Sequence, residues 1–185
     1  MKHLKSLILL ILVASGSLFT SCSEKPTYYK LSEADMSWLH YDNNQMLTFT
    51  APNGDFIQYD VVIRVKSYTV EGNVHSEFTG ANITQVDDTT IVFAGDDKGL
   101  LYISKVEEGL LVTLTWPHFP LKETPINILS QSLANIGGLN YGDVMVLDGS
   151  LLADNRNYIS KLWVSKSLGV LQMEDLAGNL WIRSN

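Results

Sequence analysis

The sequence predicts a mainly β (α+β) protein, a single domain built as a strongly curved antiparallel sheet or half-barrel of about nine or ten strands with one helix packed on it. Turn residues recur about every 8 to 12 positions, and the segments between them are rich in Val, Ile, Thr, Tyr and Phe. Of the 185 residues, 45% are apolar, which is enough for one buried core. A sandwich and a closed barrel are the other architectures that this pattern allows.

The first predicted hairpin lies within residues 47–65. Apolar and polar residues alternate from Ile57 to Val65, so one face of this strand packs and the other meets water. Asn53-Gly54 follows the apolar positions of residues 47–51 and is typical of a tight type I′ turn, in which both central residues have positive φ. Further strands are predicted at 81–86, 90–94, 100–106 and 110–116, joined by acidic or glycine turns.

One segment has the spacing of a helix. Apolar residues stand at positions 126, 129, 133 and 136, which form a stripe along one helix face. Thr124 is a suitable cap, Pro125 fits the first helical position, and Gly137-Gly138 provides an exit with positive φ. The sequence therefore predicts a helix over 125–136 that lies by its stripe on the sheet.

The chain returns to strand patterns at its end, at 143–147, 158–164, 169–174 and 180–183. The last part runs from Tyr158 through the strand Gly169-Val-Leu-Gln-Met-Glu174 to a turn and Trp181. It resembles the ending of uncharacterised outer-membrane lipoproteins of Bacteroidetes-type bacteria, and is more remotely similar to the half-barrels of the periplasmic lipoprotein-carrier class. The resemblance covers residues 158–185 and implies a half-barrel fold.

The amino-terminal segment has the layout of an export signal. Lys2 and Lys5 precede an apolar run over 7–14 that is too short to span a bilayer. The segment ends in Leu18-Phe19-Thr20-Ser21-Cys22, which resembles the lipobox of bacterial lipoproteins, with Phe19 where Leu is usual. The resemblance implies that 1–21 is a signal peptide, that Cys22 is acylated, that 22–30 is a lipidated tether and that 31–185 is the antiparallel β domain.

The alternative for Cys22 is an ordinary thiol near the cleavage point of a plain signal peptide. Cys22 is the only cysteine of the chain, so it has no partner for an internal disulfide. Several acyl chains on one residue make a durable membrane anchor, because each buried methylene contributes about 0.8 kcal/mol. Ser23 after the cysteine favours the outer membrane in lipoproteins of the enterobacterial type. The periplasmic face and the cell surface both stay open.

The charge balance excludes nucleic acid as a class of partner. The formal net charge is −7, from 13 basic and 20 acidic residues. Lys2 and Lys5 precede Cys22 and no acidic residue does, which leaves 11 basic and 20 acidic residues, a net charge of −9, from Cys22 onward. Recognition of a phosphate backbone needs clustered Lys and Arg, and here the basic residues stand singly among acids.

No sequence motif for catalysis, a metal or a cofactor is present, so we expect none of the three. His40, His75 and His118 lie too far apart in sequence to form a local metal site. The acidic pairs at 87–88, 96–97 and 107–108 allow a calcium loop, but Lys98 stands where a ligand would be useful. Solvated hairpin turns account for these pairs more simply.

The least ordinary stretch is Trp116-Pro117-His118-Phe119-Pro120. Its prolines keep it out of a central sheet, and Trp116, His118 and Phe119 are the candidate residues of a loop that stacks on a ligand or contacts a partner. The alternative is that Trp116 and Phe119 plug the sheet where it meets the helix.

These features together predict a lipid-anchored envelope protein that is not an enzyme. It would bind the membrane through acylated Cys22 and hold an apolar or glycan ligand, or an envelope protein, on its curved sheet. The first alternative is a hydrolase of envelope glycans with carboxylates assembled across strands. The second is a lipoprotein inhibitor that inserts the loop 116–120 into an envelope-degrading enzyme.

Overall fold

The structure is a computed structural model that describes residues 27–70, 74–86, 98–106, 109–120, 124–125, 131–156 and 158–184. The predicted signal peptide, Cys22 and the predicted strand at 90–94 lie outside these ranges. Within them, no helix is long and apolar enough to cross a bilayer.

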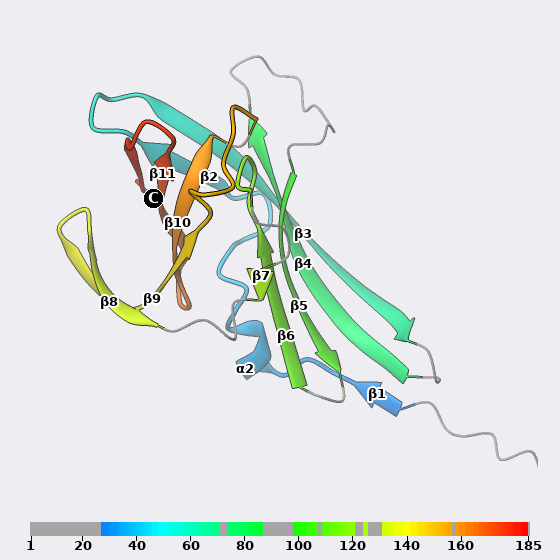
Figure 1. Cartoon of the computed structure of the whole chain (residues 1–185). Helices are drawn as coiled ribbons and strands as arrows, with labels where there is room; N and C mark the ends of the chain where they lie inside the picture. Colours follow the sequence, from blue (N-terminus) through cyan, green and yellow to red (C-terminus); the bar gives the residue numbers. More distant parts are fainter. Residues whose placement is uncertain are drawn as a thin grey trace, which may run out of the picture.

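The fold is mainly β, as the sequence predicts, and its strands form one 12-stranded sheet (Figure 1). The strands follow the order β7-β6-β5-β4-β3-β2-β12-β11-β10-β9-β8, and neighbours on this path are antiparallel. β1 pairs with β4 in parallel, off the path. The strands are β1 Thr27–Tyr29, β2 Met46–Thr50, β3 Phe56–Val70, β4 Val74–Val86, β5 Lys98–Val106, β6 Gly109–Thr115, β7 Thr124–Pro125, β8 Ser132–Ile136, β9 Leu139–Asp148, β10 Ile159–Ser165, β11 Gly169–Asp175 and β12 Leu180–Arg183.

The sheet is strongly curved, because side chains from distant strands meet inside it. Trp116 follows β6 directly and Met173 lies in β11, and five strands separate β6 from β11 along the sheet. Nevertheless the Trp116 indole N–H donates a hydrogen bond to Met173 Sδ at 3.0 Å. The sheet therefore curls until its two halves, joined where β2 pairs with β12, enclose a shared core.

Aromatic rings fill the centre of this core. Phe49 of β2 and Tyr59 of β3 meet edge to face, with ring centroids 5.8 Å apart. The ring of Trp116 lies 5.9 Å from Phe49 and 5.1 Å from Tyr59 between centroids. Such tilted aromatic pairs contribute about 0.5–1.5 kcal/mol each beyond the apolar area that they bury. Together with Met173 they occupy the concave side of the sheet.

The predicted helix over 125–136 is wrong wherever the structure describes this segment. Pro125 ends β7, residues 132–136 form β8, and 126–130 lie outside the described residues. Gly137 and Gly138 both have positive φ, 59° and 85°, and form the two-residue turn of the β8–β9 hairpin, in which Ile136 pairs with Leu139. A Gly-Gly pair satisfies a type I′ turn as readily as a helix exit, and pairing with β9 decided between them.

The helix that the described residues contain is α2, Glu33–Met36. Ser32 caps it, since the Ser32 side chain accepts from Asp35 N–H and the Asp35 carboxylate accepts from Ser32 N–H. Lys105 of β5 forms an ion pair with Asp35 at 2.7 Å and attaches this turn to the sheet. The described residues of the segment 125–136 thus form no helix, and a shorter helix lies at 33–36.

The Asn53-Gly54 hairpin forms, but with a longer connection than expected. Gly54 has a φ of 92°, whereas Asn53 is not among the residues with positive φ. Gly54 N–H donates to Ala51 O at 3.0 Å, and Ala51 N–H donates to Asp55 O at 2.8 Å. Pro52 suits the second position of an ordinary β-turn, so the connection is a turn over 51–54 that is closed by a left-handed glycine.

The segment between α2 and β2 closes the inside of the curl. Trp38 and Tyr41 are buried in the core, and the Tyr41 hydroxyl accepts a hydrogen bond from Val170 N–H at 2.9 Å. Gly169 has a φ of 77°, and a Cβ atom there would collide with the Tyr41 hydroxyl and ring. A glycine at this position is therefore required both by the backbone and by the close approach of Tyr41.

Replacing Gly169 with alanine should destabilise the fold by about 3 kcal/mol, because it combines left-handed strain with a collision in the core. Gly178→Ala is the matched control: Gly178 also has a positive φ, 84°, but open space where a Cβ would lie. Gly178→Ala should lower the free energy of unfolding by only about 1 kcal/mol. Urea denaturation of both variants measures the difference, and equal losses would contradict the Tyr41 contact.

Candidate functional site

The loop 116–120 contributes to the core rather than to an open surface. Trp116 is 3% exposed and Phe119 is 6% exposed, so the faces of both rings are covered by protein. The two residues are linked by a hydrogen bond from Phe119 N–H to Trp116 O at 3.1 Å. A stacking platform for a sugar needs an accessible ring face, and these two rings offer none in this conformation.

His118 lies at the half-buried edge of the same loop. Its ring stacks on Tyr158, with centroids 4.3 Å apart and an angle of 27° between the planes. Its backbone carbonyl accepts from Ile159 N–H at 3.1 Å, which attaches the loop to the start of β10. The structure thus brings Trp116 and Phe119 together in the core and directs His118 towards Tyr158 instead.

A polar cluster lies where β9 meets the β10–β11 turn. The Asp143 carboxylate accepts from the hydroxyl of Ser167 at 2.8 Å, from Ser167 N–H at 2.8 Å and from the hydroxyl of Ser165 at 2.9 Å. Burial acts to raise the pKa of Asp143, but the hydrogen bonds from Ser167 and Ser165 outweigh it and hold the pKa below its ordinary value. Asp143 therefore stays ionised and fixes the turn.

His40 lies near this cluster. Its Nε2 atom is buried and has no hydrogen-bond partner among the described residues, and a void of about 10 Å³ adjoins the ring. Burial, together with the charges of Arg183 and Lys166 and against an opposing effect of Asp143, lowers the pKa of His40 to about 4. A space of this size suits about one water molecule.

A serine, a histidine and an aspartate therefore gather in one region, but not as a nucleophilic triad. Ser165 is completely buried and bonds directly to Asp143, without a histidine between them. A serine nucleophile needs a base that takes its proton and a path for the substrate. The described part of the chain also brings together no group of three or more metal-ligating side chains.

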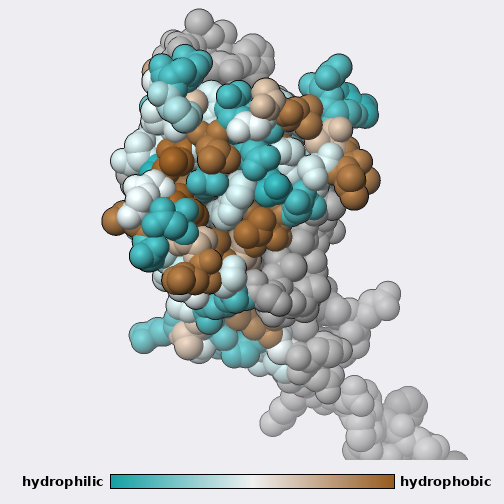
Figure 2. All heavy atoms as spheres, turned by 60° about the vertical axis from the view of Figure 1, so that its left-hand side comes forward, coloured by the Kyte–Doolittle hydropathy of each residue, from teal (hydrophilic) through white to brown (hydrophobic). Residues whose placement is uncertain are grey.

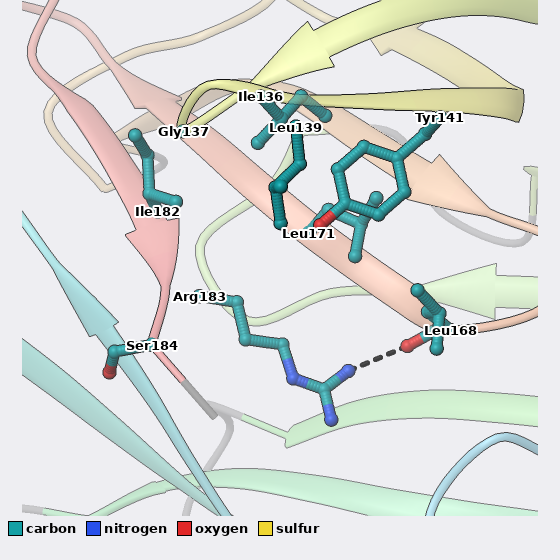
Figure 3. Close-up of a pocket in the computed structure, with 9 residues that line it drawn as sticks. All are labelled: Ile136, Gly137, Leu139, Tyr141, Leu168, Leu171, Ile182, Arg183 and Ser184. Atoms are coloured by element: carbon teal, nitrogen blue, oxygen red, sulfur yellow. Dashed lines mark hydrogen bonds between the residues drawn. The ribbon is translucent and has the colours of Figure 1, made fainter.

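An open cleft of about 380 Å³ lies on the outer side of the sheet, away from the aromatic core (Figure 3). The β8–β9 hairpin, which arches away from β10 and β11, forms one wall, and β11 and β12 form the other (Figure 1). The cleft is lined by Ile136, Gly137, Leu139, Tyr141, Leu168, Leu171, Ile182, Arg183 and Ser184.

The floor of the cleft consists of buried apolar residues, and its rim carries exposed apolar residues. Ile136 and Leu171 are buried in a second, smaller apolar cluster together with Val144. Leu139 is 63% exposed and Leu168 is 45% exposed at the rim. Figure 2, turned so that the hairpin side comes forward, shows apolar side chains interspersed with hydrophilic ones. Apolar residues held open to water around a concave site are characteristic of a binding surface.

Arg183 supplies the cationic group of the cleft. Its Nη1 donates a hydrogen bond to Leu168 O at 2.6 Å, and its guanidinium lies 5.8 Å from the centre of the Tyr41 ring. Figure 3 shows the side chain extending from β12 along the wall opposite the hairpin. The cleft therefore combines five aliphatic side chains and the ring of Tyr141 with one permanent positive charge.

Reasoning from the sequence missed this cleft. One wall of the cleft, the β8–β9 hairpin, begins within the segment predicted to be a helix. The other wall consists of the carboxy-terminal strands β11 and β12. The available signal was Gly137-Gly138 between Ile136 and Leu139, which is typical of a two-residue hairpin turn. Nothing in the sequence indicates that the hairpin arches away from β10 and leaves its apolar side open.

Stability should fall as the pH is lowered from 6.5 to about 4, because folded His40 resists a proton that the unfolded chain accepts. Above pH 6.5 the group is neutral in both states and contributes no slope. His40→Gln should flatten the profile in this window. The described aspartates with lowered pKa values, such as Asp143, act only below about pH 5.

Denaturant unfolding at half-unit steps of pH measures the effect. The parent and His40→Gln share every other titrating group, so the difference between their curves isolates His40. Parallel curves between pH 6.5 and 5 would contradict the buried, neutral state of this ring.

Comparisons with known proteins yield no relative for this chain: no protein-family model matches it, and neither a curated protein nor a solved structure does.

Proposed function

We propose that the protein is a lipid-anchored, non-enzymatic binding protein of the bacterial outer membrane and that it binds its ligand in the outer cleft between β8–β9 and β11–β12. The observation that carries the proposal is the cleft itself: about 380 Å³ with a mainly apolar lining, within the range of roughly 300–1,000 Å³ of small-molecule sites.

The packing of the concave side supports the placement of the ligand outside. Tyr59 and Met173 are completely buried, and the Trp116 indole N–H is bonded to the Met173 sulfur. A ligand inside the curl would have to displace these side chains and break that hydrogen bond, at a cost of several kcal/mol. Entry to the outer cleft breaks no contact of the main core.

The lining of the cleft supports binding rather than catalysis. Among the described residues that line it there is no histidine, cysteine or carboxylate. Its polar side chains are those of Tyr141, Arg183 and Ser184, which orient a ligand but include no base that would activate a nucleophile near neutral pH.

An anchor at Cys22 would set the orientation of the domain. Thr27 pairs with Val74 at the tip of the β3–β4 hairpin and follows Cys22 by five positions. Five residues reach at most about 18 Å, so that tip would lie close to the lipid surface. Figure 1 shows β1 and the hairpin tip at one end of the molecule and the β8–β9 hairpin at the other. The cleft would then face away from the membrane.

Cys22→Ser should release the protein from membranes, because the thioether that carries the acyl chains no longer forms. The parent should fractionate with outer membranes, incorporate labelled palmitate and migrate as the mature form. The variant should incorporate no palmitate. Membrane association and palmitate incorporation that both persist in the variant would contradict the anchor.

Leu139→Ser should weaken binding of an apolar ligand about fivefold, because the rim loses part of the contact of a leucine side chain. A neutral alkyl diazirine, irradiated with membranes that contain the full chain, should label residues 136–141 and 168–184. Labelled positions are identified by mass spectrometry of peptides.

Leu151→Ser is the matched control, since Leu151 is 98% exposed and lies outside the cleft. It should leave the labelling unchanged. Labelling centred on Trp116 and Met173 would overturn the placement of the site, and so would equal labelling of both variants.

A further inference from the structure

We infer that the outer cleft binds an aliphatic carboxylate, a medium-chain fatty acid whose tail lies between the β8–β9 hairpin and β12 and whose head is bound by Arg183. This inference rests on the proposed function and names the class of its ligand.

The tail is assigned from the shape and lining of the cleft. Aliphatic side chains and the ring of Tyr141 face the cleft from the hairpin, from the β10–β11 turn, from β11 and from β12; the aliphatic residues are Ile136, Leu139, Leu168, Leu171 and Ile182. Figure 3 shows Leu139, Tyr141 and Leu171 side by side beneath the hairpin. Each methylene that leaves water for such a site contributes about 0.8 kcal/mol. The volume lies near the lower end for ligand sites, which favours one short chain.

The head group is assigned from Arg183. A guanidinium presents five N–H donors in a planar fork, so it can keep its hydrogen bond to Leu168 O and also bind a carboxylate. The Leu168 contact, at 2.6 Å, fixes the group beside the apolar wall, where the local dielectric is low and a charge pair is stronger than in water.

The charges around the head group also favour an anion. Lys166 lies in the β10–β11 turn, which also contains Leu168 of the cleft lining. Its Nζ atom is 5.1 Å from the centre of the Trp38 ring. Both Lys166 and Arg183 act on His40, and the acid in this neighbourhood, Asp143, is held by Ser165 and Ser167. Arg183 of the cleft lining and Lys166 thus act in one neighbourhood of a chain whose formal net charge is −7. Positive charges favour a carboxylate over a neutral head group at this end of the cleft.

The test compares two photoreactive probes that differ only in the head group: a diazirine-bearing decanoic acid and the corresponding decanol, each irradiated with membranes that contain the full chain. The acid should label cleft peptides at a concentration about tenfold lower than the alcohol, as expected for a charge-assisted hydrogen bond. Decanoate should compete with this labelling. Arg183→Met should abolish the preference, and Arg183→Lys should retain part of it.

Arg156→Met is the matched control, because Arg156 is exposed and paired with Asp154, outside the cleft. It should keep the full preference for the acid. Equal labelling by acid and alcohol in the parent would overturn the assignment of the head group while leaving an apolar binding site intact. No cleft labelling by either probe would overturn the proposed function as well. Competition by a peptide with an apolar carboxy terminus, but not by decanoate, would reassign the ligand to a protein and overturn the fatty acid.

Discussion

The contact between the Trp116 indole and the Met173 sulfur is the constraint on which the rest of the structure depends. It joins the two halves of a sheet whose strands lie far apart along the hydrogen-bonded path, and it does so in the middle of the concave side. With Phe49 and Tyr59 packed around it, the curl has a solid interior. A curved sheet of this kind invites comparison with carriers that hold a ligand inside, but here that volume belongs to the protein's own side chains. Any ligand would therefore bind on the outer face of the sheet.

The outer face of the sheet has a concave site because the β8–β9 hairpin, at the end of the sheet, bends away from the neighbouring strands (Figure 1). β9 pairs with β10 through residues 144–148 and with β8 through residues 139–144, so the two ends of this strand have different neighbours. The turn at Gly137-Gly138 and the buried side chain of Ile136 keep the hairpin close to β11 and β12 without closing the gap. The same arrangement brings Arg183 and the exposed leucines to one rim, so geometry and chemistry point to the same place.

Much of the fold could be predicted from the sequence, because it depends on local patterns. The alternation over 57–65 and the turns after it predict the central meander, and the last four predicted strands correspond to β9, β10, β11 and β12, with 158–164 beginning one residue before β10. The prediction for the segment 125–136 failed because its apolar spacing fits a helix stripe and because Gly137-Gly138 suits a helix exit as well as the two-residue turn that pairs Ile136 with Leu139. The cleft could not be predicted because its walls come from segments that lie far apart in the sequence. Burial of Trp116 and Phe119 was one of two alternatives for that loop, and only packing distinguishes them.

Hydrogen exchange at the indole N–H of Trp116 tests the solid interior most directly. We expect this proton to exchange only when the whole domain unfolds, so its exchange rate should follow the free energy of unfolding as denaturant is added. The half-exposed Trp181 indole, bonded to Asp175 at 3.3 Å, should exchange much faster through local fluctuations. Exchange of Trp116 as rapid as that of Trp181 would show a hydrated, accessible concavity and would contradict the account.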